Sequence, residues 1–337
     1  MSERPDARLS AALRAAERAA AAAGVEVVEV EGVGPERGTA AVERIFDEIW
    51  STDGASVMPD EVLRMYALTG QYLSLAVEAV EAVEAVEAVE AVERAARPGP
   101  SAGPPAAIAA SLGILAAPAG MALHSHVTGV LPAGLGRGVG RAIKLHQRAW
   151  ALQRGLDVVS WTFDPLIRRN AWFNLAKLGA RPVRYLVDFY GAMPDAINAG
   201  DASDRLYVHW HLASPEVAEA AEAAEGGAPP LQDADSLRAN GFVDLVQVLP
   251  DGGARPVASD QVTGSPVRGG VPGALVATPA DAEDLRRRDL PAALTWRRAV
   301  REALGGALDA GWQIIGITRD GHYILVPQGS DRPQEDR

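Results

Sequence analysis

The sequence contains no cysteine, which excludes disulfide bonds, thiolate catalysis and cysteine-ligated zinc. It also has no apolar run long enough to cross a lipid bilayer. Its first residues, Met1-Ser-Glu-Arg-Pro, lack the basic-then-apolar pattern of a signal peptide. We therefore expect a cytoplasmic location and no membrane partner.

Basic residues are fewer than acidic ones, 32 against 44, which gives a formal net charge of −12. A chain without a basic excess is a poor candidate for non-specific binding to nucleic acid, so we expect no nucleic-acid partner. Six of those negative charges come from six Ala-Val-Glu repeats that run from Ala76 to Glu93. A period of three matches neither a helix nor a strand, so residues 76–105 are interpreted as a low-complexity insertion with a Pro-rich linker.

With 337 residues, 48% of them hydrophobic, the chain can bury one large core or two smaller ones. Hydrophobic periodicity predicts helices at 11–23, 41–50, 58–66, 141–155, 170–179 and 290–310. It predicts strands at 25–30, 107–116, 121–130, 157–163, 184–190, 205–212, 243–249 and 274–277, and a final hairpin of 312–318 with 322–326 around Asp320-Gly321. Thr278-Pro-Ala-Asp281 is expected to begin a further helix. Because strands and helices do not alternate strictly, we expect an α+β fold.

We divide the chain into an N-terminal helix at 1–24, a main domain at 25–214, a C-terminal α+β extension at 231–327 and a tail at 328–337. Residues 215–230, rich in alanine, glutamate and glycine, are interpreted as a linker between the main domain and the extension.

The most informative segment is the glycine-rich loop Gly134-Leu-Gly-Arg-Gly-Val-Gly140, which lies between the strand 121–130 and the helix 141–155. A helix N-terminus presents unpaired backbone N–H groups and the positive end of the helix dipole. Glycines allow a phosphate to approach that backbone closely. The segment therefore predicts a binding site for a phosphorylated cofactor.

A dinucleotide-binding fold is one alternative, since Asp164 ends the next strand, where a ribose-binding acid lies in such folds. However, no register of the loop reads G-x-G-x-x-G, and further strand–helix–strand units are missing. The chain also lacks a G-x-x-x-x-G-K-[ST] motif, so an NTPase is not supported.

The order of strand, Leu-Pro, Gly-Arg-Gly-Val-Gly, helix, strand and a short helix ending Lys177-Leu-Gly-Ala180 resembles the GNAT superfamily of N-acetyltransferases. That family has the signature Arg/Gln-x-x-Gly-x-Gly/Ala, and Gly138 and Gly140 lie at its glycine positions. Leu135 departs from the expected Arg or Gln, and Leu175 stands where many members have a catalytic tyrosine.

A narrower resemblance covers about residues 25 to 326. Its motifs are Leu123-His-Ser-His, Gly129-Val-Leu-Pro, Trp161-Thr-Phe-Asp-Pro-Leu166, Asn170-Ala, Tyr190-Gly-x-Met193 and Ser203-Asp-Arg-Leu206. These are similar to a branch of predicted GNAT enzymes, some of which move succinyl from succinyl-CoA to D-amino acids. The resemblance implies a mixed, mostly antiparallel sheet flanked by helices in the main domain. It also implies an acyl-CoA co-substrate (acetyl-CoA or succinyl-CoA) and a small-molecule amine acceptor, such as an amino acid.

The resemblance also implies roles for individual residues. Those expected to bind the acyl-CoA are Thr128, Val130, Gly136, Arg137, Gly138, Val139, Gly140, Arg141 and Asn170. Those expected to bind the acceptor are Asp164, Asn198, Ser203, Asp204 and Arg205, with the Arg205 guanidinium as a partner for a carboxylate. His126 is the candidate general base and Tyr190 the candidate acid for the leaving thiolate.

His124 and His126 also fit a metal pair or ordinary structural roles, as do His209 and His211, but no third ligand is suitably spaced near His124 and His126, and we expect no metal. The departures at Leu135 and Leu175 favour a competing function, a non-catalytic acyl-CoA sensor. A homodimer is compatible with either function.

Overall fold

The computed structural model describes residues 3–31, 37–51, 54–79, 106–117, 120–191, 200–223, 233–257 and 272–328. These residues form two compact units, Met1–Ser160 and Trp161–Arg337, and the division falls within a single strand, β5 (Val158–Phe163). The boundary predicted from the sequence, near residues 214–231, lies inside the second unit. Residues 76–78 of the insertion predicted at 76–105 instead end a strand that was not predicted, β2 (Tyr72–Glu78). Residues 80–105, and all but residue 328 of the tail predicted at 328–337, lie outside the described residues.

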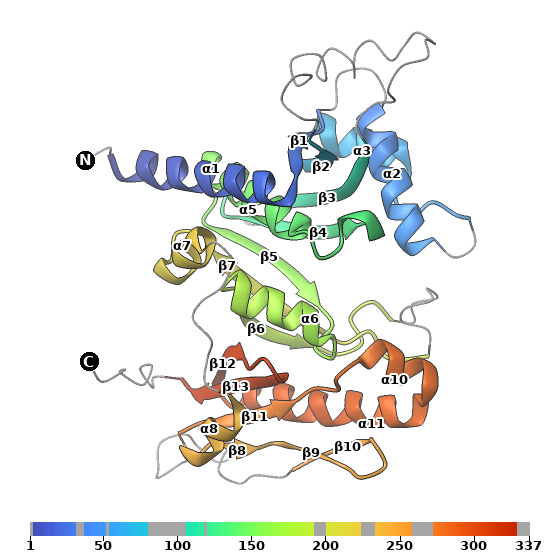
Figure 1. Cartoon of the computed structure of the whole chain (residues 1–337), viewed down its shortest axis with the longest axis vertical. Helices are drawn as coiled ribbons and strands as arrows, with labels where there is room; N and C mark the ends of the chain where they lie inside the picture. The colour runs from blue at the N-terminus through green and yellow to red at the C-terminus, as the bar shows by residue number, and fades with distance from the viewer. Residues whose placement is uncertain are drawn as a thin grey trace. The chain divides into compact units, whose positions relative to one another are not determined.

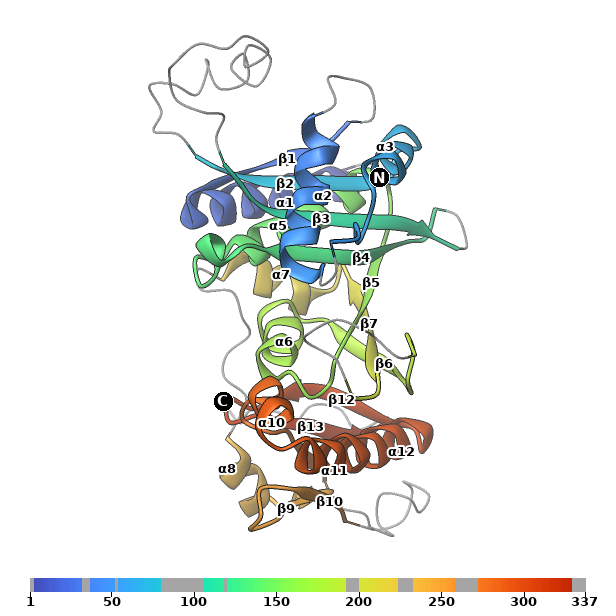
Figure 2. The ribbon, with the colours of Figure 1, turned by 90° about the vertical axis from the view of Figure 1, so that its right-hand side faces the viewer.

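The first unit is built on a mixed, mostly antiparallel sheet in which β1 (Val25–Glu29), β2 (Tyr72–Glu78), β3 (Ala107–Ala116) and β4 (Ala122–Val130) are neighbours in that order. The beginning of β5 joins β4 in parallel. Helices α2 (Arg37–Trp50) and α3 (Asp60–Leu68) cover one face of this sheet, and α1 (Glu3–Ala23) and α5 (Val139–Gln153) cover the other (Figures 1 and 2). The unit is therefore a three-layer α+β structure.

Alternation along β2 explains why both faces of the sheet are covered. Leu73 and Leu75 join the hydrophobic cluster formed with α2 and α3, whereas Tyr72 contacts His146 and Trp150 of α5. On the α5 side, α1 packs through alanines at helical spacing, and their small side chains allow the two helices to approach closely. These buried residues are Ala12, Ala15, Ala16, Ala19 and Ala23.

The second unit contains three smaller groups of strands. β6 (Arg181–Leu186) and β7 (Arg205–His211) are antiparallel, as are β9 (Val246–Val248) and β10 (Ala254–Pro256). A four-stranded sheet has the order β12 (Trp312–Ile317), β13 (His322–Pro327), β11 (Ala274–Ala277) and β8 (Val243–Asp244). Its helical segments are α6 (Arg168–Ala171), the π-helical turn Trp172–Lys177, α7 (Pro215–Glu222), α8 (Ala234–Ala239), α10 (Ala282–Arg288), α11 (Leu290–Val300), the π-helical turn Arg301–Gly305 and α12 (Gly306–Asp309).

A buried network of ion pairs stabilises this unit. Arg297 of α11 contacts Asp164 at 2.8 Å and Asp201 at 2.7 Å, and Arg286 of α10 also reaches both carboxylates. All four side chains are less than 10% exposed, so none is compensated by water. Because a buried charge without a partner is costly, removing Arg297 or Arg286 would leave Asp164 and Asp201 with uncompensated charge and destabilise this unit.

Several boundaries differ from the sequence prediction. Residues 215–222, interpreted as linker, form α7, whose N-terminus is capped by the Ser214 side chain accepting from the Val217 N–H. The strand predicted at 184–190 is β6 at 181–186, followed by a turn in which Asp188 has a φ of 44°. The helix predicted at 290–310 is interrupted by a π-helical turn, and α8 and β10 were not predicted.

Candidate functional site

The glycine loop ends where α5 begins, and Gly138 is the N-cap of that helix with a φ of 90°. Gly136 also has a positive φ, of 76°, a backbone conformation that residues with a Cβ rarely adopt. Within the described ranges, the backbone N–H groups of Gly136, Gly138, Val139 and Gly140 donate to no backbone oxygen. Four donors thus gather at the positive end of a 15-residue helix.

The space above these amides is open. A Cβ built on Gly136 would meet no atom within 4 Å, and one on Gly138 or Gly140 would meet its nearest neighbour at 4.0 or 3.9 Å. The glycines therefore do not serve to admit a neighbouring protein side chain. They leave open space beside the backbone, which a phosphate could occupy.

Two arginines were predicted to bind the cofactor, Arg137 within this loop and Arg141 directly after it, and both have protein partners. The Arg137 guanidinium donates to Glu78 at 2.8 Å and to the carbonyl of Ala23, at the end of α1, at 3.2 Å. It thereby fastens the loop to α1 and β2. Arg141 is the third residue of α5, and its backbone N–H donates to the Gly138 carbonyl at 3.0 Å. Leu135, at the departure from the family signature, is 65% exposed.

The strand that leads into the loop contains a β-bulge at His126. Leu112 of β3 pairs with Val127 of β4, but the next residue, Gly113, pairs with Ser125. His126 is therefore the extra residue, and a bulge of this kind redirects side chains and interrupts regular pairing. This bulge could not be read from the sequence, because it depends on the register between two strands.

The second edge of β4 is only partly used. The parallel pairing with β5 joins Ala122–His124 to Val158–Ser160 and then ends. From Ser125 to Val130, no strand among the described residues pairs with this edge. Thr128 bonds across to Ser111 of β3 at 2.8 Å, and half-buried Val130 ends the strand where the loop begins. The free edge of β4 therefore leads directly to the open amides of α5.

Two histidine rings lie at the start of this free edge, with their centroids 6.3 Å apart. Burial, then the charges of His126 and Lys144, lower the pKa of His124 to about 4, and its Nδ1 lies 3.1 Å from the Ser160 hydroxyl. Partial burial also lowers the pKa of His126 below 6.5. Both imidazoles are therefore neutral at pH 7, and each retains a nitrogen that can accept a proton.

Lys144, which was not predicted as a site residue, lies on the buried face of α5. Its ammonium donates to the Ser125 hydroxyl at 2.7 Å and lies 3.4 Å from the side-chain oxygen Oε1 of Gln147. Desolvation lowers its pKa from 10.5 to about 7. No local signal marked it, because a single lysine in a helix is normally solvated.

The remaining predicted residues lie in the second unit, and two of them are held in ion pairs. Burial alone would raise the pKa of Asp164, but the hydrogen bonds and charge of Arg297 lower it overall. Asp204 behaves in the same way, with two bonds from Arg301 (2.7 and 2.8 Å) and one from Tyr185 (2.7 Å). Both carboxylates are already bonded by protein donors.

Ser203 and Asp204 hold the turn that carries Tyr190. The Ser203 hydroxyl accepts from the Tyr190 N–H at 2.8 Å, and Asp204 accepts from the Asp188 N–H at 3.0 Å. The Tyr190 hydroxyl lies 3.0 Å from Thr162, and its ring lies 5.2 Å from the guanidinium of buried Arg205. Arg205 also donates to the Asp204 carbonyl at 2.8 Å. These four predicted residues thus form one cluster in which Tyr190 is exposed.

Among the described residues, no hydrogen bond or ring contact joins Asn170 to that cluster. Asn170 is an exposed residue of α6, and its N–H donates to the Ile167 carbonyl, while its side chain caps no helix. Asn198 lies outside the described residues. The position of the family tyrosine, Leu175, is only 2% exposed and offers no proton donor.

Neither histidine pair belongs, among the described residues, to a larger group of acidic or histidine side chains. His209 and His211 of β7 have ring centroids 6.0 Å apart, similar to the first pair. Across the part of the chain that the structure describes, no group of three or more acidic or histidine side chains is arranged to hold a metal ion. Over the same residues, no helix is both long and apolar enough to cross a membrane.

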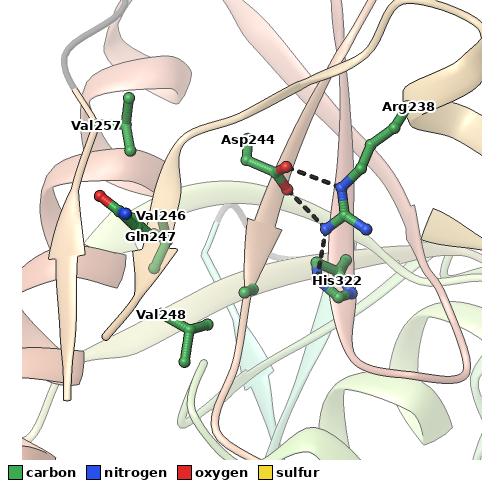
Figure 3. Close-up of a pocket in the computed structure, with 8 residues that line it drawn as sticks. Arg238, Asp244, Val246, Gln247, Val248, Val257 and His322 are labelled. Atoms are coloured by element: carbon green, nitrogen blue, oxygen red, sulfur yellow. Dashed lines mark hydrogen bonds and ion pairs between the residues drawn. The ribbon is translucent and has the colours of Figure 1, made fainter. Parts of the chain in front are cut away.

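A surface hollow of about 390 Å³ lies in the second unit, beside β8, β9 and β13 (Figure 3). Arg238 points toward it but forms two bonds to Asp244, at 2.8 and 2.9 Å, and lies 3.2 Å from His322. Valines 246, 248 and 257 form its apolar part. None of the residues predicted for the functional site lines this hollow.

No protein-family model and no curated protein matches the chain. Among solved structures, an acetyltransferase of the GNAT family from Streptococcus pneumoniae is similar, with a TM-score of 0.39 and 12% identity over 55% of this chain and 98% of that one. A GNAT family acetyltransferase from Elizabethkingia anophelis with acetyl-CoA bound has a TM-score of 0.36 and 11% identity, over 56% and 98%. An IAA acetyltransferase from Bacillus cereus has a TM-score of 0.34 and 12% identity, over 55% and 97%.

Proposed function

We propose that the protein is an acyl-CoA-dependent N-acyltransferase. The observation that carries this proposal is the continuity between an open glycine-lined helix N-terminus and the free edge of a bulged strand, β4. The first feature suits a pyrophosphate, and the second suits an extended chain with amide groups. Coenzyme A has both parts in the same order, because its pyrophosphate is joined to a pantetheine arm. The sequence resemblance to the GNAT signature supports the same assignment.

In this proposal the amides of residues 136–140 bind the pyrophosphate, and the dipole of α5 adds favourable electrostatics. The unpaired edge between Ser125 and Val130 pairs with the pantetheine amides, as an added strand would. A backbone N–H near Val130 then polarises the thioester carbonyl and stabilises the oxyanion that forms on it.

The reaction forms a carbon–nitrogen bond and breaks the carbon–sulfur bond of the thioester. The acceptor amine attacks the carbonyl carbon, and its proton must be removed before the amide is complete. His126 is the proposed base, because it lies at the bulge and its lowered pKa keeps it neutral at pH 7. The products are the N-acyl compound and the free thiol of CoA. Tyr190 remains the residue proposed to protonate the departing sulfur.

The acceptor is proposed to be an amino acid and the acyl group acetyl or succinyl, on the resemblance alone. Arg205 is proposed to hold the acceptor carboxylate. Replacing it as Arg205→Lys removes the planar fork, so the KM for an amino acid should rise more than the KM for its amide. Equal effects on both acceptors would instead assign Arg205 to the Tyr190 turn, where it already bonds the Asp204 carbonyl.

The proposed cofactor site is tested by Gly138→Val, which places a branched side chain in the open space above the amides. Gly155→Val is a matched control, because Gly155 also has a positive φ (72°) and no neighbour within 4 Å, but it follows the far end of α5. Both variants bear similar backbone strain. In calorimetric titration, Gly138→Val should lose acetyl-CoA binding and Gly155→Val should retain it. Unchanged binding by Gly138→Val would refute the cofactor site.

A non-catalytic acyl-CoA sensor is the second candidate. It is favoured by Leu175, which is buried and cannot supply the proton that the family tyrosine supplies. A sensor would bind acyl-CoA in the titration above but release no thiol with any amine. An N-acyltransferase would do both.

A further inference from the structure

A buried lysine lies beneath the bulge of β4. Lys144 is 6% exposed, and its partners Ser125 and Gln147 are 4% and 0% exposed. Lysine is almost never buried this deeply without a specific reason, because removing an ammonium from water is costly. Its shortest described contact is the 2.7 Å bond to the Ser125 hydroxyl, which joins α5 to β4.

The neighbouring strand leaves room for this arrangement. Gly113 pairs with Ser125, and a Cβ on Gly113 would lie 3.2 Å from the Gln147 amide nitrogen and 3.1 Å from Leu123. Both distances are tighter than ordinary contacts, so a larger residue would press on the side chains around Lys144. The absence of a side chain at Gly113 therefore leaves the space that Lys144, Ser125 and Gln147 occupy.

The bond between Lys144 and Ser125 lies directly beside the β-bulge of β4. Ser125 immediately precedes His126, the extra residue of the bulge, and the register changes between the pairs Leu112–Val127 and Gly113–Ser125. A bulge can move along a strand by one residue, and such a slip exchanges the faces of the side chains beside it. A fixed Ser125 side chain determines which residue becomes the extra one.

The bond between Lys144 and Ser125 also connects α5, which carries the glycine loop at its N-terminus, to the bulge of β4. Lys144 follows Gly138, the N-cap, by six residues, which is about 9 Å along the axis of a helix. One helix thus carries the open amides at its N-terminus and the hydrogen bond to β4 further along. The offset between the pyrophosphate end and the bulge is set by that bond.

We propose that Lys144, by bonding Ser125, is a positioning residue that fixes the β4 bulge and with it the place of His126 relative to the glycine loop. This proposal rests on the proposed function for its catalytic consequence. The lowered pKa of Lys144 agrees with it, because the uncharged amine that is half-populated near pH 7 still donates N–H to Ser125.

The decisive variant is Lys144→Met, which keeps most of the side-chain volume and removes the donor. Tyr72→Phe is the matched control, because it removes another buried bond of α5 to the sheet, the 3.0 Å contact with His146, at β2. Hydrogen exchange at residues 125–128 should accelerate at least tenfold in Lys144→Met and less than threefold in Tyr72→Phe. Unchanged exchange at 125–128 in Lys144→Met would overturn the proposal whether or not the protein is an enzyme.

Kinetics give the second readout. In Lys144→Met the kcat for thiol release should fall at least tenfold, and acyl-CoA affinity should fall by a smaller factor, because the intact glycine loop still binds the pyrophosphate. Ser125→Ala should produce the same loss, and the double variant should add little to it. A variant that only unfolds more easily, with wild-type kcat, would assign Lys144 a purely structural role.

If Lys144→Met does not fold, Ser125→Ala alone decides by the same two measurements. Failure of the proposed function is recognised separately, because the wild-type protein would then release no thiol while the exchange result still reports on the bulge.

Discussion

The buried ammonium of Lys144 predicts an unusual dependence of stability on pH. Its pKa falls from 10.5 in a solvated lysine to about 7 in the folded protein. Between pH 7 and pH 10.5, Lys144 keeps its proton in the unfolded chain but increasingly loses it in the folded protein as the pH rises. Stability rises with pH wherever the unfolded state binds more protons, so this group destabilises the fold most at and below pH 7 and progressively less as pH rises towards 10.5.

The size of the effect follows from those two values. At pH 7 the folded lysine is half-protonated and the unfolded lysine fully so, and above pH 8 the difference approaches one proton, worth about 1.4 kcal/mol for each pH unit. Between pH 7 and pH 9, the unfolding free energy should therefore increase by roughly 2 kcal/mol from this group alone. The side chain is nearly fully buried, so solvent screening reduces this figure little.

The assay is urea unfolding of the wild type and Lys144→Met at pH 7, 8 and 9, followed by circular dichroism and tryptophan fluorescence. Other groups titrate in both proteins, so the difference between the two isolates the lysine. The wild type should gain roughly 2 kcal/mol relative to Lys144→Met across this range. A difference that stays constant within about 0.5 kcal/mol would refute the idea that Lys144 is desolvated in the folded protein.

Two further predictions concern the ion pairs and the proposed base. Arg297→Met leaves the buried carboxylates of Asp164 and Asp201 without their main cation, and should lower the unfolding free energy by about 3–5 kcal/mol. The control Arg169→Met breaks the exposed pair with Glu283 and should lower it by less than about 1 kcal/mol. Equal losses of unfolding free energy in urea would contradict the role given to the buried network. Burial lowers the pKa of His126, so kcat/KM for thiol release should fall with decreasing pH only below pH 6.5. His126→Gln should remove this acid limb of the pH profile. An unchanged pH profile in His126→Gln would exclude His126 as the general base.

Local signals in the sequence were sufficient for the glycine loop and for the strand and helix around it. Two glycines of the loop have positive φ, as expected for a loop that turns sharply into a helix, and α5 begins at Val139, two residues before the predicted start. The mixed, mostly antiparallel sheet of the first unit also agrees with the predicted α+β fold. The error at 215–222 was one of interpretation, because Ser214-Pro215 is an ordinary helix start that the alanine- and glutamate-rich composition obscured.

Other features have no local signal. The pair between Asp164 and Arg297 joins positions 133 residues apart, and neither residue is unusual in its own segment. The bulge at His126 depends on how β3 and β4 are aligned, which the sequence of β4 alone does not determine. Lys144 was overlooked because a single lysine in a helix is normally solvated, and only the packing of α5 on the sheet reveals its burial.

The most direct test of the account is thiol release from acetyl-CoA and succinyl-CoA with a panel of D- and L-amino acids and simple amines. The protein contains no cysteine, so a thiol-reactive dye reports only the CoA that is released. An N-acyltransferase should give release that depends on both protein and amine, with one N-acyl product formed for each thiol. Absence of amine-dependent release across the whole panel, from a protein that still binds acyl-CoA, would contradict the proposed transferase and leave the sensor.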